Sequence, residues 1–92
     1  MAIVTLRYWA AAKEAAGIAE ETISAATLAE ALAAAQGKAE GDQRTGQNSR
    51  LQAVLARSSF LIDGMPAGSR APETIMLTDA AVIEVLPPFA GG

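Results

Sequence analysis

The stretch VIEVLPPFAGG, residues 82–92, joins an apolar strand pattern to an unusual peptide. Four of the five residues at 82–86 are apolar, which is typical of a strand buried on both faces in the middle of a sheet. Pro87 and Pro88 hold φ at about −65° and lack a backbone N–H, so they cannot extend that strand. The pattern therefore predicts a central strand at 82–86 from which residues 87–92 project.

The segment after this strand combines residue types that suit insertion into a partner. Phe89 places an aromatic ring just beyond the stiff proline pair, where it can anchor in a pocket. Ala90, Gly91 and Gly92 carry almost no side chain, so a narrow channel can admit their backbone. Six extended residues reach about 20 Å. We therefore expect the α-carboxylate of Gly92 to be the functional group, with an inert, frayed end as the alternative.

Length and composition limit what the rest of the chain can be. Ninety-two residues, 51% hydrophobic and 18% charged, suit one folded domain at 1–86, with 87–92 as a flexible tail. Seven basic and ten acidic side chains give a net charge of −3 without a basic cluster, so we expect neither a nucleic-acid nor a membrane partner. Neither a signal segment nor a bilayer-length apolar run is evident, which predicts a cytoplasmic protein.

Two residue types are missing from the sequence. The chain contains no Cys and no His, which excludes a disulfide, a usual zinc site and a Ser-His-Asp triad. We therefore expect no metal and no active site within the chain. Three carboxylates remain as candidates for chemistry. Glu20 and Glu21 are neighbours on a predicted strand and so point to opposite faces, which favours a solvated edge, whereas Asp63 precedes Gly64 in a typical tight turn.

The first third of the chain alternates strand and helix patterns. Residues 3–8 alternate β-forming and polar side chains, which predicts a half-buried strand. The alanine-rich residues 9–16 predict a short helix that ends at Gly17, and residues 18–24 suit an edge strand.

The clearest helix pattern covers residues 27–36. Thr27 and Glu30 have the spacing of a capping box, and apolar residues then recur at helical intervals until Gly37. Beyond it we expect a surface loop at 38–48 and a helix at 49–55, in which Ser49 and Gln52 form a second capping box. A strand at 60–62 should then enter a tight turn and return strand at 63–66. An irregular segment at 69–74 and a turn at 78–81 follow.

These elements predict an α+β fold in which a sheet is covered by helix on one face. From periodicity alone, the core beneath the helix at 27–36 should contain Val4, Leu6, Leu28, Leu32, either Leu61 or Ile62, and either Ile83 or Val85. Strands that are apolar on both faces also leave apolar side chains on the open face. We expect that face, together with Phe89, to dock on a partner.

These elements are followed by the segment Leu86-Pro87-Pro88-Phe89-Ala90-Gly91-Gly92. With this order and this ending, the chain resembles the small subunit of molybdopterin synthase, a ubiquitin-like sulfur carrier with a β-grasp fold and a mixed sheet. The resemblance covers the whole chain, and its specific part is the tail. It implies that Gly92 is adenylated and then converted to a thiocarboxylate, that Gly91 threads beside it, and that residues 87–90 form the guided stem. Because the chain has no cysteine, it cannot carry sulfur as its own persulfide.

The resemblance also implies a set of partners. An adenylyltransferase similar to ubiquitin-activating enzymes uses ATP on the tail, and a persulfide donor supplies sulfur. The large synthase subunit, in a heterotetramer with this non-catalytic subunit, then passes the sulfur to a cyclic pyranopterin in molybdenum cofactor biosynthesis. No cofactor is expected to be bound by the chain itself.

Some features depart from the family pattern, and other fates of the tail stay open. Phe89 replaces a smaller aliphatic residue, residues 79–81 replace a turn that often contains glycine, and the loop at 38–48 is long. The alternatives are a sulfur carrier for thiazole, cysteine or tRNA thiolation, a ubiquitin-like modifier joined to lysines, and an interaction domain with an inert tail. The thiazole carriers are usually shorter and lack the double proline.

Overall fold

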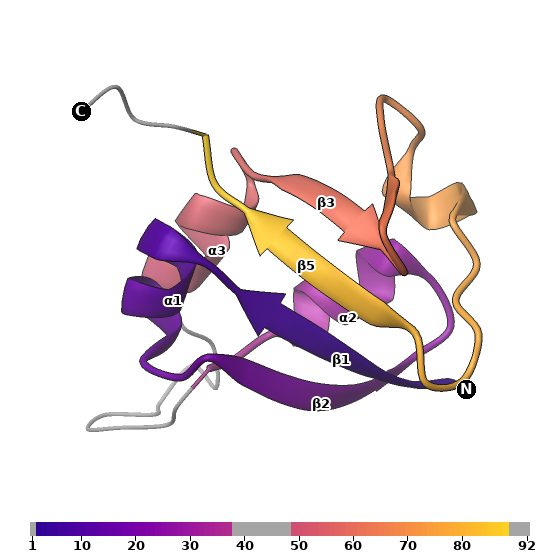
Figure 1. The fold of residues 1–92 in the computed structure, drawn as a ribbon, viewed down its shortest axis with the longest axis horizontal. Coiled ribbons are helices and arrows are strands. Elements are labelled where there is room, and N and C mark those ends of the chain that lie inside the picture. The colour runs from indigo at the N-terminus through magenta and orange to yellow at the C-terminus, as the bar shows by residue number, and fades with distance from the viewer. Residues whose placement is uncertain (1, 38–48, 89–92) are drawn as a thin grey trace.

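The strand β5, Val82–Leu86, lies in the middle of a five-stranded mixed sheet in this computed structural model, which describes residues 2–37 and 49–88 (Figure 1). The strand order is β2-β1-β5-β3-β4. In chain order, the other elements are β1 (Ala2–Tyr8), α1 (Ala10–Ala16), β2 (Glu20–Ala25), α2 (Leu28–Ala34), α3 (Ser49–Leu55), β3 (Ser59–Ile62), β4 (Met65–Pro66) and the 3-10 helix η1 (Pro72–Thr74).

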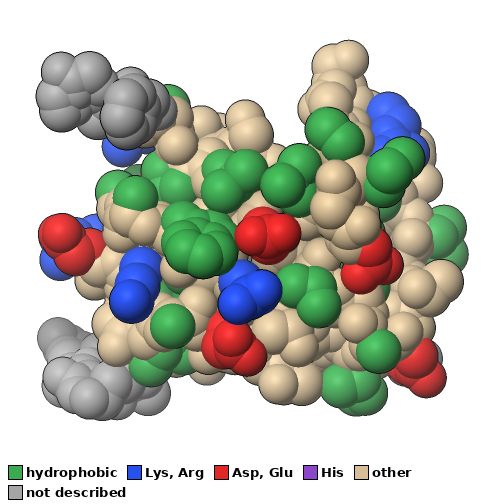
Figure 2. Space-filling view, in the orientation of Figure 1, with side chains coloured by type: hydrophobic (Ala, Val, Ile, Leu, Met, Phe, Trp, Pro, Cys, Tyr) green, Lys and Arg blue, Asp and Glu red, His purple; other side chains and the backbone are tan. Residues whose placement is uncertain are grey.

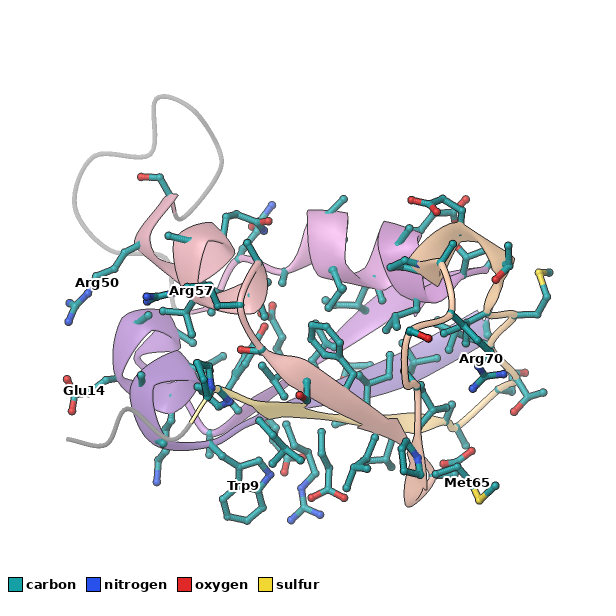
Figure 3. All side chains as sticks on the ribbon, turned by 90° about the horizontal axis from the view of Figure 1, so that it is seen from above. Trp9, Glu14, Arg50, Arg57, Met65 and Arg70 are labelled. Atoms are coloured by element: carbon teal, nitrogen blue, oxygen red, sulfur yellow. The ribbon has the colours of Figure 1, made fainter. Side chains whose placement is uncertain are left out.

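Strand direction gives the sheet its mixed character. β1 pairs with β2 in antiparallel fashion and with β5 in parallel, while β3 is antiparallel to both β5 and β4. The helices cover one face, and Trp9 and Met65 lie on the other side of the sheet (Figure 3). The predicted α+β fold and the central position of β5 are therefore confirmed, as is the edge position of the strand that carries Glu20 and Glu21.

The core lies between the sheet and the helices. Alternate side chains of β1 and of β5 point inward, and α2 contributes Leu28 and Ala31. The predicted members are confirmed: Val4, Leu6, Leu28, Ile83 and Val85 are buried, and Leu32 and Ile62 pack against them. Phe60, which was not predicted, also packs against this core. Ile62, rather than Leu61, faces the core. In β5, both of the alternative residues, Ile83 and Val85, face it.

Local sequence signals explain most element boundaries. Gly17 adopts φ of 77° where α1 ends, which is the left-handed cap that glycine favours. At the start of α2, the Thr27 hydroxyl accepts a hydrogen bond from the Glu30 N–H at 3.2 Å, and a Glu30 carboxylate oxygen accepts one from the Ala26 N–H at 2.9 Å. The predicted capping pair is thus present, although Glu30 reaches one residue further back than in the usual box.

Two predicted boundaries are wrong by two residues each, and two predicted roles are also wrong. The second strand begins at Glu20 rather than residue 18, and α2 ends at Ala34 rather than residue 36. Ser49 is the first residue of α3 rather than its cap, and the Gln52 side-chain NH2 donates to the Leu32 and Ala35 carbonyls at 3.0 and 3.1 Å. Glu21 is not simply solvated, since one of its carboxylate oxygens accepts hydrogen bonds from Tyr8 and from the backbone after α2.

The predicted turn at Asp63-Gly64 is confirmed. Both residues have positive φ, 52° and 85°, and they join Ile62 to Met65 in a two-residue hairpin. Asp63 also accepts a hydrogen bond from the Val82 N–H at 3.0 Å, so its carboxylate stabilises the start of β5. The segment predicted to be irregular contains η1, and the predicted loop at 38–48 lies outside the described residues.

Candidate functional site

The predicted tail begins where β5 ends. β5 ends at Leu86, Pro87 is half-buried and Pro88 is exposed. The remaining predicted site residues, Phe89, Ala90, Gly91 and Gly92, lie outside the described residues. The described part of the site is therefore the base of the tail and the surface around it.

The two neighbours of β5 determine what surrounds the tail base. On one side Tyr8 pairs with Val85, and the chain passes from β1 through Trp9 into α1. On the other side Ser59 pairs with Leu86, and the chain arrives there from α3. In Figure 1, α1 and α3 both lie at the end of the sheet where β5 ends. The start of α1 and the end of α3 therefore flank the tail base.

Trp9 is the largest exposed side chain near this point. It is 45% exposed, its indole N–H donates to a Glu84 carboxylate oxygen at 3.2 Å, and the Arg7 guanidinium carbon lies 5.8 Å from the ring centroid. Arg7 is also 3.7 Å from Glu20 across the β1–β2 pair. These contacts hold the indole on the open face of the sheet, where an aromatic ring of this kind is suited to burial against a partner.

The open face carries further apolar side chains, as the sequence predicts. Ile3 is 51% exposed and Met65 is 67% exposed, while Leu61 and Leu86 are half-buried. Figure 2 looks onto this face and shows apolar side chains spread among acidic and basic ones. The face is thus a mixed surface, with charged groups lying between its apolar residues.

Behind the open face, a hydrogen-bond network holds the end of β1. Tyr8 is 2% exposed and its hydroxyl donates to Glu21, whose same oxygen accepts the N–H groups of Gln36 and Gly37 at 3.1 and 2.7 Å. Burial, and then the Glu21 carboxylate, raise the pKa of Tyr8 far above its ordinary value. Tyr8 therefore stays neutral, and the network is structural.

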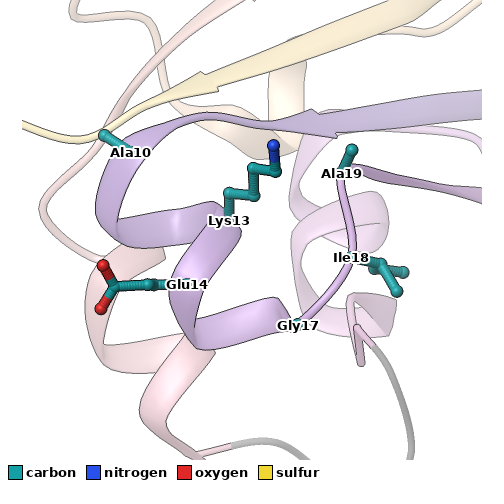
Figure 4. Close-up of a pocket in the computed structure, with 6 residues that line it drawn as sticks. All are labelled: Ala10, Lys13, Glu14, Gly17, Ile18 and Ala19. Atoms are coloured by element: carbon teal, nitrogen blue, oxygen red, sulfur yellow. The ribbon is translucent and has the colours of Figure 1, made fainter.

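One surface hollow lies near the tail base, and a second lies between β3 and residues 66–72. One, of about 500 Å³, lies between α1 and the turn that follows it, and is lined by Ala10, Lys13, Glu14, Gly17, Ile18 and Ala19 (Figure 4). The other, of about 280 Å³, lies against the start of β3 and is lined in part by Ser58, Ser59, Phe60 and Arg70. Neither holds a nucleophile paired with a base.

The described residues contain neither a metal-binding cluster nor a membrane-spanning helix. No group of three or more acidic side chains in residues 2–37 and 49–88 is placed to hold a metal ion. Within those same ranges, no helix has both the length and the apolar character needed to cross a bilayer.

Sequence reasoning missed the position of Trp9. The pattern predicted that Trp9 begins a helix, whereas it precedes α1 and lies on the open face. The alternation of β1 could have indicated this position, because Trp9 continues the alternate positions Ile3, Thr5 and Arg7, whose side chains point to the open face.

Comparisons with known proteins bear on the fold. No protein-family model matches the chain, and no curated protein sequence does. Among solved structures, the small archaeal modifier protein 1 of Methanosarcina acetivorans is similar over 100% of this chain and 98% of its own, with a TM-score of 0.75 and 24% identity.

Two further structures agree with this likeness. The small archaeal modifier protein 1 of Haloferax volcanii gives a TM-score of 0.72 at 19% identity, over 98% of this chain and 99% of its own. A candidate molybdopterin converting factor subunit 1 from Pyrococcus furiosus gives 0.68 at 17% identity, over 96% and 99%. At such identities the likeness concerns the fold, and the chain has the ubiquitin-like β-grasp fold that the sequence predicts.

Proposed function

We propose that this chain is a ubiquitin-like sulfur carrier that acts as the small subunit of molybdopterin synthase. One observation carries the proposal: a Gly91-Gly92 pair lies a few residues beyond the central strand of a β-grasp sheet, after a stiff Pro87-Pro88 stem. The fold likeness to modifier proteins and to a candidate molybdopterin converting factor subunit supports the same assignment.

The proposed chemistry takes place at the Gly92 carboxylate. A carboxylate is a poor acyl donor, because oxide is a poor leaving group. An adenylyltransferase joins the carboxylate to the AMP part of ATP and releases pyrophosphate. The terminal sulfur of a persulfide then attacks the acyl carbon and AMP leaves. A second thiol cleaves the resulting acyl disulfide, which frees the thiocarboxylate and leaves a disulfide on the donor.

Each part of the chain has a role in this proposal. Gly92 carries the sulfur, Gly91 threads beside it, and Pro87, Pro88, Phe89 and Ala90 guide the tail into the large synthase subunit. The large subunit transfers the sulfur to a cyclic pyranopterin, and the two subunits form a heterotetramer. ATP belongs to the activating enzyme, and this chain binds no cofactor.

Mass spectrometry of the purified chain tests the proposal. Replacing oxygen by sulfur at Gly92 raises the mass by about as much as oxidation of a methionine, so the gain must be located in a C-terminal fragment. It should appear after incubation with ATP, an adenylyltransferase and a persulfide donor, and alkylation should convert it to a thioester adduct. A C-terminal fragment of unchanged mass, from a chain that has bound the adenylyltransferase, would refute sulfur carriage.

A second candidate function is attachment of Gly92 to lysines of other proteins as a modifier. The similar structures include small archaeal modifier proteins, with TM-scores of 0.75 and 0.72, and the function in their names motivates this candidate. Both candidates need adenylation, so capture by an activating enzyme with ATP separates them from an inert interaction domain. A ladder of conjugates in cells would support the modifier, and free thiocarboxylate without conjugates would support the carrier.

The partner surface in this proposal is the open face next to the tail. Trp9→Ala should weaken capture by the large subunit about tenfold or more, because an exposed aromatic ring is a common binding hot spot. The midpoint of thermal unfolding should change little, since the ring is 45% exposed. Met76→Ala is a matched control, because Met76 is 70% exposed but lies outside the five strands. Equal weakening by both variants would contradict this docking site.

A further inference from the structure

The cations of the described residues are distributed unevenly along the molecule. They are Arg7, Lys13, Arg50, Arg57 and Arg70. Arg50 and Arg57 lie at one end of the molecule and Arg70 at the other (Figure 3). Lys13 is on α1, whose first turn flanks the tail base (Figure 4). Lys13, Arg50 and Arg57 therefore belong to the end at which β5 finishes, whereas Arg7 lies opposite Glu84 in the middle of β5.

Carboxylates compensate only part of this charge. Arg7 lies 3.7 Å from Glu20, and Arg50 lies 3.9 Å from Glu14. Lys13 and Arg57 have no such carboxylate partner in residues 2–37 and 49–88. Both side chains are exposed, so they can meet the charges of another molecule.

These two cations lie on opposite sides of the tail base. Arg57 is two residues before Ser59, which pairs with Leu86. β1 pairs with the other edge of β5, and the chain continues from it through Trp9 to Ala10, the first residue of α1. Lys13 is one helical turn further along α1. We call Lys13 and Arg57 the basic pair. The apolar surface of Trp9 and the proline stem lie on the same end of the sheet.

The far end of the sheet carries the opposite charge. Asp63 and Asp79 lie near the start of β5 and β1, where they accept the backbone N–H groups of Val82 and Ile3. The chain as a whole has a net charge of −3. Of the three described cations without a described carboxylate partner, Lys13 and Arg57 lie at the end from which the tail leaves and Arg70 lies at the far end. The described residues therefore have a charge gradient along β5, and such a gradient orients an approaching charged partner.

We propose that the protein which receives the tail presents acidic side chains to the basic pair, beside an apolar site for Trp9. This inference rests on the proposed function, in which another protein takes the tail. A nucleic acid fits less well, because its affinity grows with many phosphate contacts, whereas two isolated cations next to an indole match carboxylates on a protein surface.

The charges should act mainly on the rate of association. Charges at the rim of an interface steer the encounter, and salt screens them over about 8–10 Å at ordinary ionic strength. Lys13→Glu and Arg57→Glu should each slow association about fivefold at low salt, and the difference from the wild type should shrink toward zero at high salt. Dissociation rates should change less.

A titration that needs no natural partner tests the charge argument directly. The isotope-labelled chain is titrated with a decaglutamate peptide at low ionic strength, and amide chemical shifts are followed by NMR. Shifts should concentrate at residues 9–14, 56–60 and 84–86, and they should disappear in Lys13→Glu/Arg57→Glu and at high salt. Shifts that are absent, or equally large around Arg70, would overturn the proposal. So would tighter binding of an RNA decamer than of the peptide.

Arg70 provides a matched control for the kinetic experiment. Arg70→Glu makes the same change in net charge at the far end, so its association rate with a captured adenylyltransferase should stay near the wild-type value. If all three single reversals slow association equally, only net charge matters and the basic pair is not a site. If no adenylyltransferase is captured, the carrier proposal is in doubt, while the peptide titration still decides on the acidic partner surface.

Discussion

Ala80 has a left-handed backbone with φ of 70°, although it carries a Cβ. That conformation costs about 1–2 kcal/mol for an L-residue, whereas glycine adopts it freely at an entropic cost of about 0.5–1 kcal/mol. Ala80→Gly should therefore raise the free energy of unfolding by roughly 0.5–1 kcal/mol, measured by urea denaturation. The backbone hydrogen bond from Ala80 to the Ile3 carbonyl, at 2.8 Å, would be kept.

The same substitution in a helix is the control. Ala53 is exposed within α3, so Ala53→Gly should lower stability by about 0.5–1 kcal/mol through backbone entropy alone. If both variants lose stability, the conformation of Ala80 does not strain the chain.

Tyr8 should make stability depend on alkaline pH. Its folded pKa is raised above the ordinary value of 10.0, so its contribution is complete below about pH 10 and is lost as the pH rises further. The loss is about 1.4 kcal/mol per pH unit once the unfolded chain ionises. Tyr8→Phe lacks this titration and loses one hydrogen bond to Glu21, which costs about 1–2 kcal/mol at neutral pH.

The stability difference between wild type and Tyr8→Phe should therefore narrow above about pH 10. Chemical denaturation at a series of pH values measures it, and the other titrating groups cancel in the difference. A constant difference across this range would mean that the Tyr8 hydroxyl ionises as readily in the folded protein as in the unfolded chain.

At the level of elements, α2 shows where local patterns stop being informative. The capping residues Thr27 and Glu30 determine its start, and these were readable from the sequence. Its end is determined by residues distant in sequence, because Glu21 binds the N–H groups of Gln36 and Gly37 while Gln52 binds carbonyls at the end of the helix. No pattern within residues 27–37 contains those partners, so the predicted end was wrong.

Gly37 should be sensitive to substitution because it lies against α1. Its φ is 65°, and a Cβ there would be 2.5 Å from the Ala16 carbonyl oxygen and 2.7 Å from the Ala16 Cα. Gly37→Ala should cost roughly 2–4 kcal/mol, the sum of backbone strain and a clash with backbone atoms. The midpoint of urea unfolding measures this loss.

Gly64 is a control that distinguishes the cost of backbone strain from the cost of the steric clash at Gly37. It also has a positive φ, 85°, but a Cβ would meet no atom within 4 Å. Gly64→Ala should therefore cost only about 1 kcal/mol. Equal losses in the two variants would show that close packing of Gly37 on α1 contributes nothing.

The sequence predicted which strands lie at the centre and at the edge of the sheet, but it did not predict which side chains of every strand face the core. The apolar run at 82–86 indicated a central strand, and the paired glutamates indicated an edge, because both features are visible along the chain. Whether Leu61 or Ile62 faces the core was not predictable, since both are apolar and the pairing partner decides the register.

At the scale of the whole molecule, the fold connects one end of the sheet to the proposed chemistry. The central strand ends between β1, which leads into α1, and β3, which follows α3, and this places Trp9 and the basic pair beside the stem. The sequence indicated the tail because its residue types are contiguous. The surrounding surface could not be predicted, because it combines residues from β1, α1 and the end of α3 that only the topology brings together.

The carrier proposal requires Gly92 to be the terminal residue of the active protein. One added residue moves the reactive carbonyl past the partner's catalytic groups, and misplacement by about 1 Å can cost on the order of a hundredfold in rate. Adding Ala after Gly92 and deleting Gly92 should each leave the unfolding midpoint unchanged but abolish molybdopterin formation in a strain lacking this protein. An added N-terminal residue is the control and should preserve it. Restored synthesis by a chain that retains a C-terminal tag would contradict the proposal.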